Sequence, residues 1–247
     1  MAKKRIDTLL VTRGLVNSRE KARILVMAGE VMVNSSKMVK PSTLVSEDAE
    51  IRLIESLPFV GRGGIKLNWA LERFEIDVIS MVALDVGASN GGFTDCLLQH
   101  DALRVYAVDV GYGQLDYKLR QDPRVIVMER VNARYAFELP EMVDIATVDV
   151  SFISLEKVIP SVFTLVKPGG FIIALVKPQF EAGRSKVGKG GVVKDPLVHA
   201  EVISRFINWA VGHGLRFLHM VRSPILGADG NREFLVLLQK NLVTYAI

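Results

Sequence analysis

The segment Val82-Ala83-Leu84-Asp85-Val86 is mostly apolar and runs directly into Gly87-Ala88-Ser89-Asn90-Gly91-Gly92. Short apolar runs that end in a glycine-rich turn are typical of a buried strand followed by a helix. In open α/β sheets, ligands bind beyond the carboxyl ends of the strands, where glycines let the backbone approach a nucleotide closely. The segment therefore predicts a nucleotide-binding turn at residues 87–92.

Apolar runs and helical patterns alternate on both sides of this turn. We expect a helix at about 64–75 before it, and further strands at 104–110, 124–128, 143–149, 171–177, 215–222 and 233–239. Such alternation indicates a doubly wound, mainly parallel α/β sheet, in which we expect the last strand to be antiparallel.

The first sixty residues follow a different pattern, which predicts a small α+β domain. A short helix at 6–11 precedes a second helix, which Asn17 or Ser18 can cap and Gly29 can end. A hairpin follows at 31–37, with strand-like pieces around Val39 and Ile51. We expect a small basic domain at 1–57, a linker at 58–63 and the α/β domain at 64–247.

The positive charge of the chain is concentrated at its start. Residues 1–45 contain nine Lys and Arg against three acidic residues, a net charge of +6; since the whole chain carries +4, the remainder carries −2. Concentrated basic charge is expected where a protein contacts phosphates, although a solvated basic face would look the same. Our candidates for contact with nucleic-acid phosphates, which become the candidates for RNA contact under the resemblance given below, are Lys3, Lys4, Arg5, Arg19, Lys21, Arg23 and Lys189.

Composition excludes several classes of protein. Among 247 residues, no apolar run approaches the ~18 residues of a membrane-spanning helix, and Asp7 interrupts any signal-like start. The single Cys96 allows no internal disulfide, and there is no cluster of ligands for a metal. We expect a cytoplasmic protein without membrane or metal partners; the sequence does not indicate its oligomeric state.

The spacing of the glycines helps to distinguish between two candidate cofactors, a nicotinamide dinucleotide and S-adenosylmethionine. Asp109 ends the next strand about twenty residues on, where a carboxylate can bind ribose hydroxyls of either a nicotinamide dinucleotide or S-adenosylmethionine. A strict GxGxxG is absent, which favours S-adenosylmethionine. A second glycine-rich segment, 183–190, fits GxxxxGK but lacks the following Ser or Thr of a phosphate-binding loop. We interpret 181–195 as a loop over the site that offers Lys186, Lys189 and Lys194 to RNA.

Four polar residues are expected at one edge of the sheet. Lys66 lies in the leading helix, Asp149 and Lys177 close two strands, and Glu233 opens the last. Because an antiparallel last strand begins beside the carboxyl ends of its neighbours, all four can face one cleft, although ordinary ion pairs would give the same pattern. The fourth strand ends in Asp149-Val150-Ser151-Phe152 without the diproline common in amine methylation, and Cys96 in a helix is a poor candidate nucleophile.

These motifs resemble known families over nearly the whole chain. Ser18-Arg19-Glu20-Lys21-Ala22 and Gly29-Glu30-Val31-Met32-Val33-Asn34 resemble the RNA-binding module of ribosomal protein S-four. The chain also resembles the FtsJ/RrmJ-type ribose 2'-O-methyltransferases, whose tetrad is matched in chain order by Lys66, Asp149, Lys177 and Glu233. With Arg62-Gly63-Gly64, Asp109-Val110-Gly111-Tyr112-Gly113 and Lys177-Pro178-Gln179-Phe180-Glu181, the chain is similar to the TlyA family, also called hemolysin A-like. Asn90 departs from the Thr more often expected there.

The resemblance implies a Rossmann-like methyltransferase that modifies cytidine ribose in ribosomal RNA or ribosomal subunits. Our hypothesis makes Lys177 the base, Lys66 and Glu233 positioning groups, and Asp149 the group that holds the lysines. Cofactor contacts are expected from Gly87, Ser89, Gly91, Gly92, Phe93, Asp109, Asn132 and Asp149. Two other readings are a membrane-lytic protein, which the family name raises, and a non-catalytic RNA-binding assembly factor.

Overall fold

The computed structural model describes residues 3–16, 18–27, 29–38, 40–53, 58–227 and 229–242. It separates into two compact units, Met1–Leu57 and Pro58–Ile247. Residues 58–63, expected as a linker, therefore belong to the second unit, whose first helix already begins at Arg62. The proposed cap Asn17 and the strand-like Val39 lie outside the described residues.

The N-terminal unit contains two short helices, α1 (Ile6–Thr12) and α2 (Arg19–Met27), and two small antiparallel sheets. One sheet pairs β1 (Lys3–Arg5) with β4 (Leu44–Ser46). The other has the order β3-β2-β5, built from Ser36–Met38, Val31–Val33 and Ile51–Leu53. Ser18 Oγ accepts a hydrogen bond from Lys21 N at 3.2 Å, and Gly29 adopts a φ of +71°. The predicted helix–helix–hairpin order is confirmed.

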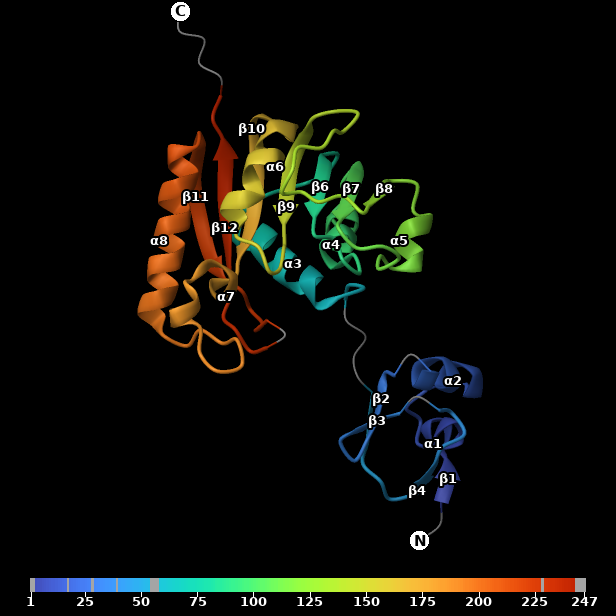
Figure 1. Ribbon diagram of the computed structural model, residues 1–247. Coiled ribbons are helices and arrows are strands. Elements are labelled where there is room, and N and C mark those ends of the chain that lie inside the picture. Colours follow the sequence, from blue (N-terminus) through green and yellow to red (C-terminus); the bar gives the residue numbers. More distant parts are fainter. Residues whose placement is uncertain are drawn as a thin grey trace, which may run out of the picture. The chain divides into compact units, whose positions relative to one another are not determined.

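The second unit is built on a seven-stranded sheet, shown in Figure 1, with the order β11-β12-β10-β9-β6-β7-β8. In chain order, the strands are β6 (Val82–Val86), β7 (Arg104–Asp109), β8 (Val125–Glu129), β9 (Val143–Val148), β10 (Val166–Val176), β11 (Leu215–Arg222) and β12 (Phe234–Lys240). Only β12 pairs antiparallel with both its neighbours; the remaining pairs are parallel. The predicted mainly parallel sheet with an antiparallel last strand is confirmed.

Helices cover both faces of this sheet. Helices α3 (Arg62–Phe74) and α4 (Gly92–Gln99) pack on one face, while α6 (Ile159–Leu165) and α8 (Pro196–Gly212) pack on the other. The short helices are α5 (Tyr117–Gln121), α7 (Pro178–Glu181), η1 (Leu155–Lys157) and η2 (Arg184–Lys186).

Strand β6 shows how side-chain alternation creates two cores. Leu84 packs in a cluster that contains Phe206 of α8, whereas its neighbour Ala83 packs in the opposite cluster with Leu67 of α3 and Leu97 of α4. Consecutive residues of a strand point to opposite faces of the sheet. A central strand that helices cover on both sides therefore needs apolar side chains on both faces. Polar side chains that take part in chemistry are therefore expected at the edge of the sheet where the parallel strands end.

Candidate active site

The turn after β6 requires glycine at two positions. Gly87 has a φ of +84°, and a Cβ there would lie 2.3 Å from the backbone oxygen of Asp149. Gly91, with a φ of +97°, begins α4, and a Cβ there would lie 2.2 Å from Leu119 Cδ1. Side chains would therefore both strain the backbone and collide with neighbouring segments. The glycines keep the ends of β6 and β9 close together and leave the turn open.

Asp109 at the end of β7 fixes the outer part of this turn. Its carboxylate accepts hydrogen bonds from the backbone N–H groups of Ser89 at 2.8 Å and Gly111 at 2.7 Å. A carboxylate offers about four lone-pair directions, so these two bonds leave Asp109 able to accept further hydrogen bonds from ribose hydroxyls.

Asp85 lies fully buried in β6, just before the glycine turn. Its oxygens accept hydrogen bonds from Thr94 Oγ1 of α4 at 2.7 Å and Thr147 Oγ1 of β9 at 3.0 Å, so one carboxylate joins three elements around the turn. Burial raises the pKa of Asp85 to about 6; the two threonine hydroxyls oppose this shift, and the charge of Asp149 adds to it. The sequence analysis missed this residue, although its position ahead of the glycines was a signal.

Two cavities meet at this edge of the sheet. One, of about 540 Å³, extends toward α3, α7 and Glu233, and the other, of about 450 Å³, lies between the ends of β7 and β9. Both are lined by Gly87, Ser89, Asp149, Ser151 and Phe152. An elongated ligand that spans both cavities would cross the glycine turn at Gly87.

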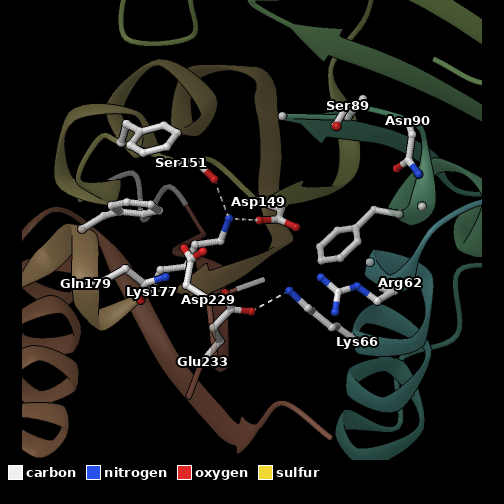
Figure 2. A pocket seen from close by; sticks show the side chains of 17 residues that line it. Arg62, Lys66, Ser89, Asn90, Asp149, Ser151, Lys177, Gln179, Asp229 and Glu233 are labelled. Atoms are coloured by element: carbon white, nitrogen blue, oxygen red, sulfur yellow. Dashed lines mark hydrogen bonds and ion pairs between the residues drawn. The ribbon is translucent and has the colours of Figure 1, made fainter. Parts of the chain in front are cut away.

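The four predicted catalytic residues all line the larger cavity and form two lysine–carboxylate pairs (Figure 2). Lys66 Nζ donates to Glu233 Oε2 at 2.5 Å, and Lys177 Nζ lies 2.6 Å from Asp149 Oδ1. Lys177 Nζ also donates to Ser151 Oγ at 2.9 Å. We expected Asp149 to hold both lysines; instead, Glu233 holds Lys66, because α3 and the start of β12 face each other across the cavity.

Asp149 Oδ1 is buried but forms no hydrogen bond with the described residues, despite its ion-pair distance to Lys177. Lys177 Nζ, 2.6 Å away, compensates the charge of this atom, so the pair places a carboxylate and an amine together in the wall of the cavity. Together with the open glycine turn and the acceptor Asp109, this arrangement fits the expected S-adenosylmethionine.

The structure distributes the predicted cofactor residues between the two cavities. Gly92 and Phe93 line the larger one, Asp109 and Asn132 line the smaller one, and Gly87, Ser89 and Asp149 line both. Gly91 is not among the residues that line either cavity, and its part is to shape the start of α4.

The cavity also contains residues that the sequence analysis did not single out for catalysis. Ser151 binds Lys177, and Gln179 Oε1 is buried without a hydrogen-bond partner among the described residues. Arg62 and Asp229 also line this cavity and are labelled in Figure 2. Arg62 and Gln179 stand in motifs that we quoted for the family, whereas nothing local in the sequence marks Asp229.

The loop at 181–195 is attached to the segment that leads to Glu233. Asn231 is 1% exposed; its Nδ2 donates to Gly191 O and its Oδ1 accepts from Val193 N, both at 2.9 Å. Lys189 in this loop is exposed, but Lys186 is paired with Glu201 at 2.5 Å. Of the three loop lysines offered to RNA, Lys186 therefore already has an acidic partner.

In the N-terminal unit, the six predicted RNA contacts lie on two elements, β1 and α2, and all are exposed. Asp7 beneath them is buried, hydrogen-bonded by Arg5 at 2.8 Å and paired with Arg19 at 3.4 Å. The Arg5 guanidinium lowers the pKa of Asp7 to about 2, which keeps this carboxylate charged. Asp7 thus holds one arginine from each element, while Lys4 pairs with Glu47 at 3.1 Å.

Other chemistries find little support in the described residues. Burial raises the pKa of the Cys96 thiol well above its usual range, so a reactive thiolate is disfavoured. The described part of the chain contains no group of three His, Cys, Asp or Glu residues placed to hold a metal ion. None of its helices is long and apolar enough to cross a membrane.

Comparisons with known proteins agree with this geometry. The model of the FtsJ-like methyltransferases matches residues 59–240, and the S4 domain matches residues 4–51. The 16S/23S rRNA (cytidine-2'-O)-methyltransferase TlyA of Mycobacterium tuberculosis is 43% identical over 95% of this chain and 89% of its own length. Hemolysin A of Brachyspira hyodysenteriae is 39% identical over 94% and 98%.

A solved structure from Streptococcus thermophilus is 44% identical, covers 98% of this chain and 90% of its own, and superimposes with a TM-score of 0.75. The family match spans the glycine turn, both cavities and all four residues of the lysine–carboxylate pairs. The chain therefore belongs to the FtsJ-like methyltransferase family and is an S-adenosylmethionine-dependent RNA methyltransferase with an N-terminal S4 domain.

Proposed function

We propose that the enzyme transfers a methyl group to a ribose 2'-hydroxyl of ribosomal RNA, with cytidine as the target nucleoside. The observation that carries this proposal is the pairing of Lys177 with Asp149 and of Lys66 with Glu233 in one cavity beside the glycine turn. The name of the Mycobacterium tuberculosis relative, a cytidine-2'-O-methyltransferase acting on 16S and 23S rRNA, supports the choice of acceptor.

The chemistry needs a base and a fixed geometry. An alcohol is a weak nucleophile, and bound S-adenosylmethionine supplies an electrophilic methyl group, so the protein must align the hydroxyl and remove its proton. In this proposal, Lys177 accepts the proton at Nζ. Asp149 and Ser151, at 2.6 and 2.9 Å from that atom, then stabilise the ammonium that forms.

Lys66 and Glu233 are assigned to positioning. Their hydrogen bond joins α3 to the segment before β12, and both side chains are almost fully buried. A pair that is already satisfied is poorly suited to accept a proton, but it fixes the wall of the cavity against which a ribose would rest. The exposed ring of Phe152 and the half-buried ring of Phe180, with centroids 4.9 Å apart, offer apolar surface at the same cavity.

The direct test is transfer of radiolabelled methyl from S-adenosylmethionine to ribosomal subunits and to free ribosomal RNA. We expect label in a dinucleotide that resists both alkali and nuclease, because 2'-O-methylation blocks cleavage at that linkage. Label in a mononucleotide would show base methylation and overturn the choice of acceptor. Absence of incorporation on every substrate, with cofactor still bound, would instead favour an RNA-binding factor without catalysis.

A further inference from the structure

The segment that brings Glu233 to the active site places an arginine on the opposite face of the sheet. Ser223 N donates to Glu233 O at 2.9 Å, so the β11–β12 ladder continues past Phe234. Successive side chains of extended backbone alternate between faces. Glu233 contacts Lys66 of α3, whereas Phe234 contacts His199 of α8, with ring centroids 5.6 Å apart. Arg232 therefore shares the α8 face with Phe234.

A second arginine reaches the same place from the edge strand. Arg222 is the register partner of Phe234 on β11, so it points to the α8 face as well. Arg222 and Arg232 together line two hollows, one of about 220 Å³ with residues 223–226 and one of about 450 Å³ with residues of α8. The two arginines thus line the same hollows near the carboxyl edge of the sheet, on its α8 face.

No acidic side chain balances this pair. Neither hollow has an Asp or Glu among its lining residues, and neither arginine forms an ion pair within the part of the chain that the structure describes. By contrast, the arginines at 104, 120, 124 and 205 each contact a carboxylate. Two uncompensated like charges in one place favour binding of an anion.

The chemistry of the pair matches phosphate. The guanidinium fork binds phosphate oxygens through paired hydrogen bonds, and it stays charged at any physiological pH. The neighbouring loop, which Asn231 attaches to the same segment, adds exposed Lys189 and Lys194. A row of cations beside a catalytic cavity is suited to a ligand that carries phosphates in series.

We infer that Arg222 and Arg232 form a phosphate site that binds the RNA backbone next to the target nucleotide. This inference rests on the proposed function, because it takes ribosomal RNA as the substrate. Arg232 precedes Glu233 directly but faces the other side of the sheet, so in this inference an RNA strand whose ribose lies against Lys66 and Glu233 passes the end of the sheet before a flanking phosphate meets the pair. The site positions substrate and takes no part in proton transfer.

The test compares Arg222→Gln, Arg232→Gln and the double variant with Arg216→Gln. Arg216 is an exposed arginine of the same strand, six residues earlier, which places it about 20 Å away toward the other edge of the sheet. The measurement is the affinity of the full chain for transcribed ribosomal RNA between 50 and 200 mM salt, roughly the range over which phosphate contacts show their salt dependence. S-adenosylhomocysteine affinity serves as the check on folding.

Log affinity falls as log salt concentration rises, and we expect each single substitution to make this slope less steep by about 1. The double substitution should make it less steep by about 2, and the affinity for the cofactor should stay unchanged. Arg216→Gln should match the wild type within about twofold. A double variant with the slope of Arg216→Gln, while the wild type still binds and methylates RNA, would overturn the phosphate site and leave the proposed function standing. A wild type that neither binds nor methylates RNA would instead refute the proposed function.

A second experiment distinguishes two possible ligands of the site, the RNA backbone and a small phosphate compound. Inorganic phosphate is titrated into the wild type and the double variant without RNA. For a backbone site we expect only weak binding to the wild type, because a single phosphate lacks the contacts of the rest of the chain. Tight binding that the double variant loses, without any change in RNA affinity, would assign the site to a free phosphate compound and overturn the RNA assignment.

Discussion

The two lysine–carboxylate pairs of the active site use the same residue types in different ways. Lys66 and Glu233 form a direct hydrogen bond of 2.5 Å, and their side chains are only 10% and 3% exposed. Lys177 Nζ lies as close to Asp149 Oδ1, but it also donates to Ser151 Oγ, and the Asp149 side chain is 19% exposed. The first pair is enclosed, whereas the second has a hydroxyl beside it and is more open to the cavity. This difference in enclosure is the basis for assigning a positioning role to the first pair and a chemical role to the second.

The largest effect is expected at Lys177. Lys177→Ala should lower methyl transfer by about 10²- to 10⁴-fold, the usual contribution of a general base, because Lys177 supplies the amine that the structure pairs with Asp149. S-adenosylhomocysteine should bind as it does to the wild type. Single-turnover transfer of labelled methyl to ribosomal RNA measures the first quantity, and calorimetric titration measures the second.

Arginine substitutions test most directly whether Lys177 and Lys66 have different roles. Arginine keeps the positive charge but cannot serve as a base, so Lys177→Arg should be about as inactive as Lys177→Ala. Lys66→Arg keeps the ion pair with Glu233 and should retain much more activity. Equal losses in the two arginine variants would remove the division of labour proposed here.

The next effect concerns stability. Lys66→Met leaves the buried Glu233 carboxylate without its partner, which typically costs about 3–5 kcal/mol of unfolding free energy. The double variant Lys66→Met/Glu233→Gln should recover most of this loss. Lys177→Met should cost less, because Asp149 is 19% exposed and can be hydrated. Urea unfolding of the wild type and the three variants measures the difference; equal costs for the two single methionine variants would show that the pairs are equally enclosed.

Sequence reasoning found the four residues but not how they pair. Each lies at a strand end or in the leading helix, and such positions follow from local apolar patterns. Which lysine meets which carboxylate depends on how α3 faces the segment before β12, and that contact spans 167 positions. The start of β10 was missed for a related reason: Val166 pairs with Val143 across the sheet, but Lys167-Pro168-Gly169-Gly170 interrupts the apolar pattern before Phe171. The Asn231 contacts to Gly191 and Val193 also join loops far apart in sequence.

A smaller effect is expected from Asp85, beneath the second pair. Burial is the main cause that raises the pKa of Asp85 in the folded state to about 6, from an ordinary value of about 3.8, so the stability that the neutral form contributes is fully present below pH 3.8. That stability is lost as the pH rises through 6, by up to about 3 kcal/mol. Asp85→Asn should remove this decline. The measurement is the unfolding free energy of the wild type and of the variant from pH 4 to 8, and the difference between the two should follow the titration of Asp85.

The charge of Asp149 contributes to the raised pKa of Asp85, so Asp149→Asn should move the midpoint of that decline to lower pH. Glu233→Gln is the matched control, because Glu233 is not among the groups that shift Asp85. A midpoint that moves equally in both variants would show that the shift does not report on the second pair.

The smallest effect is expected at Ser151, which distinguishes the second pair from the first. Its hydroxyl accepts the hydrogen bond that orients Lys177 Nζ, and a bond of this kind is worth about 0.5–1.5 kcal/mol, so Ser151→Ala should lower methyl transfer roughly 2- to 10-fold. If Ser151 acts through the lysine, adding Ser151→Ala to Lys177→Ala should lower the residual rate no further. The same factor in both backgrounds would mean that the hydroxyl contacts a reactant directly. Lys66, whose ammonium is already directed at Glu233, needs no such hydroxyl, and this is why the two lysines of one cavity can differ in function.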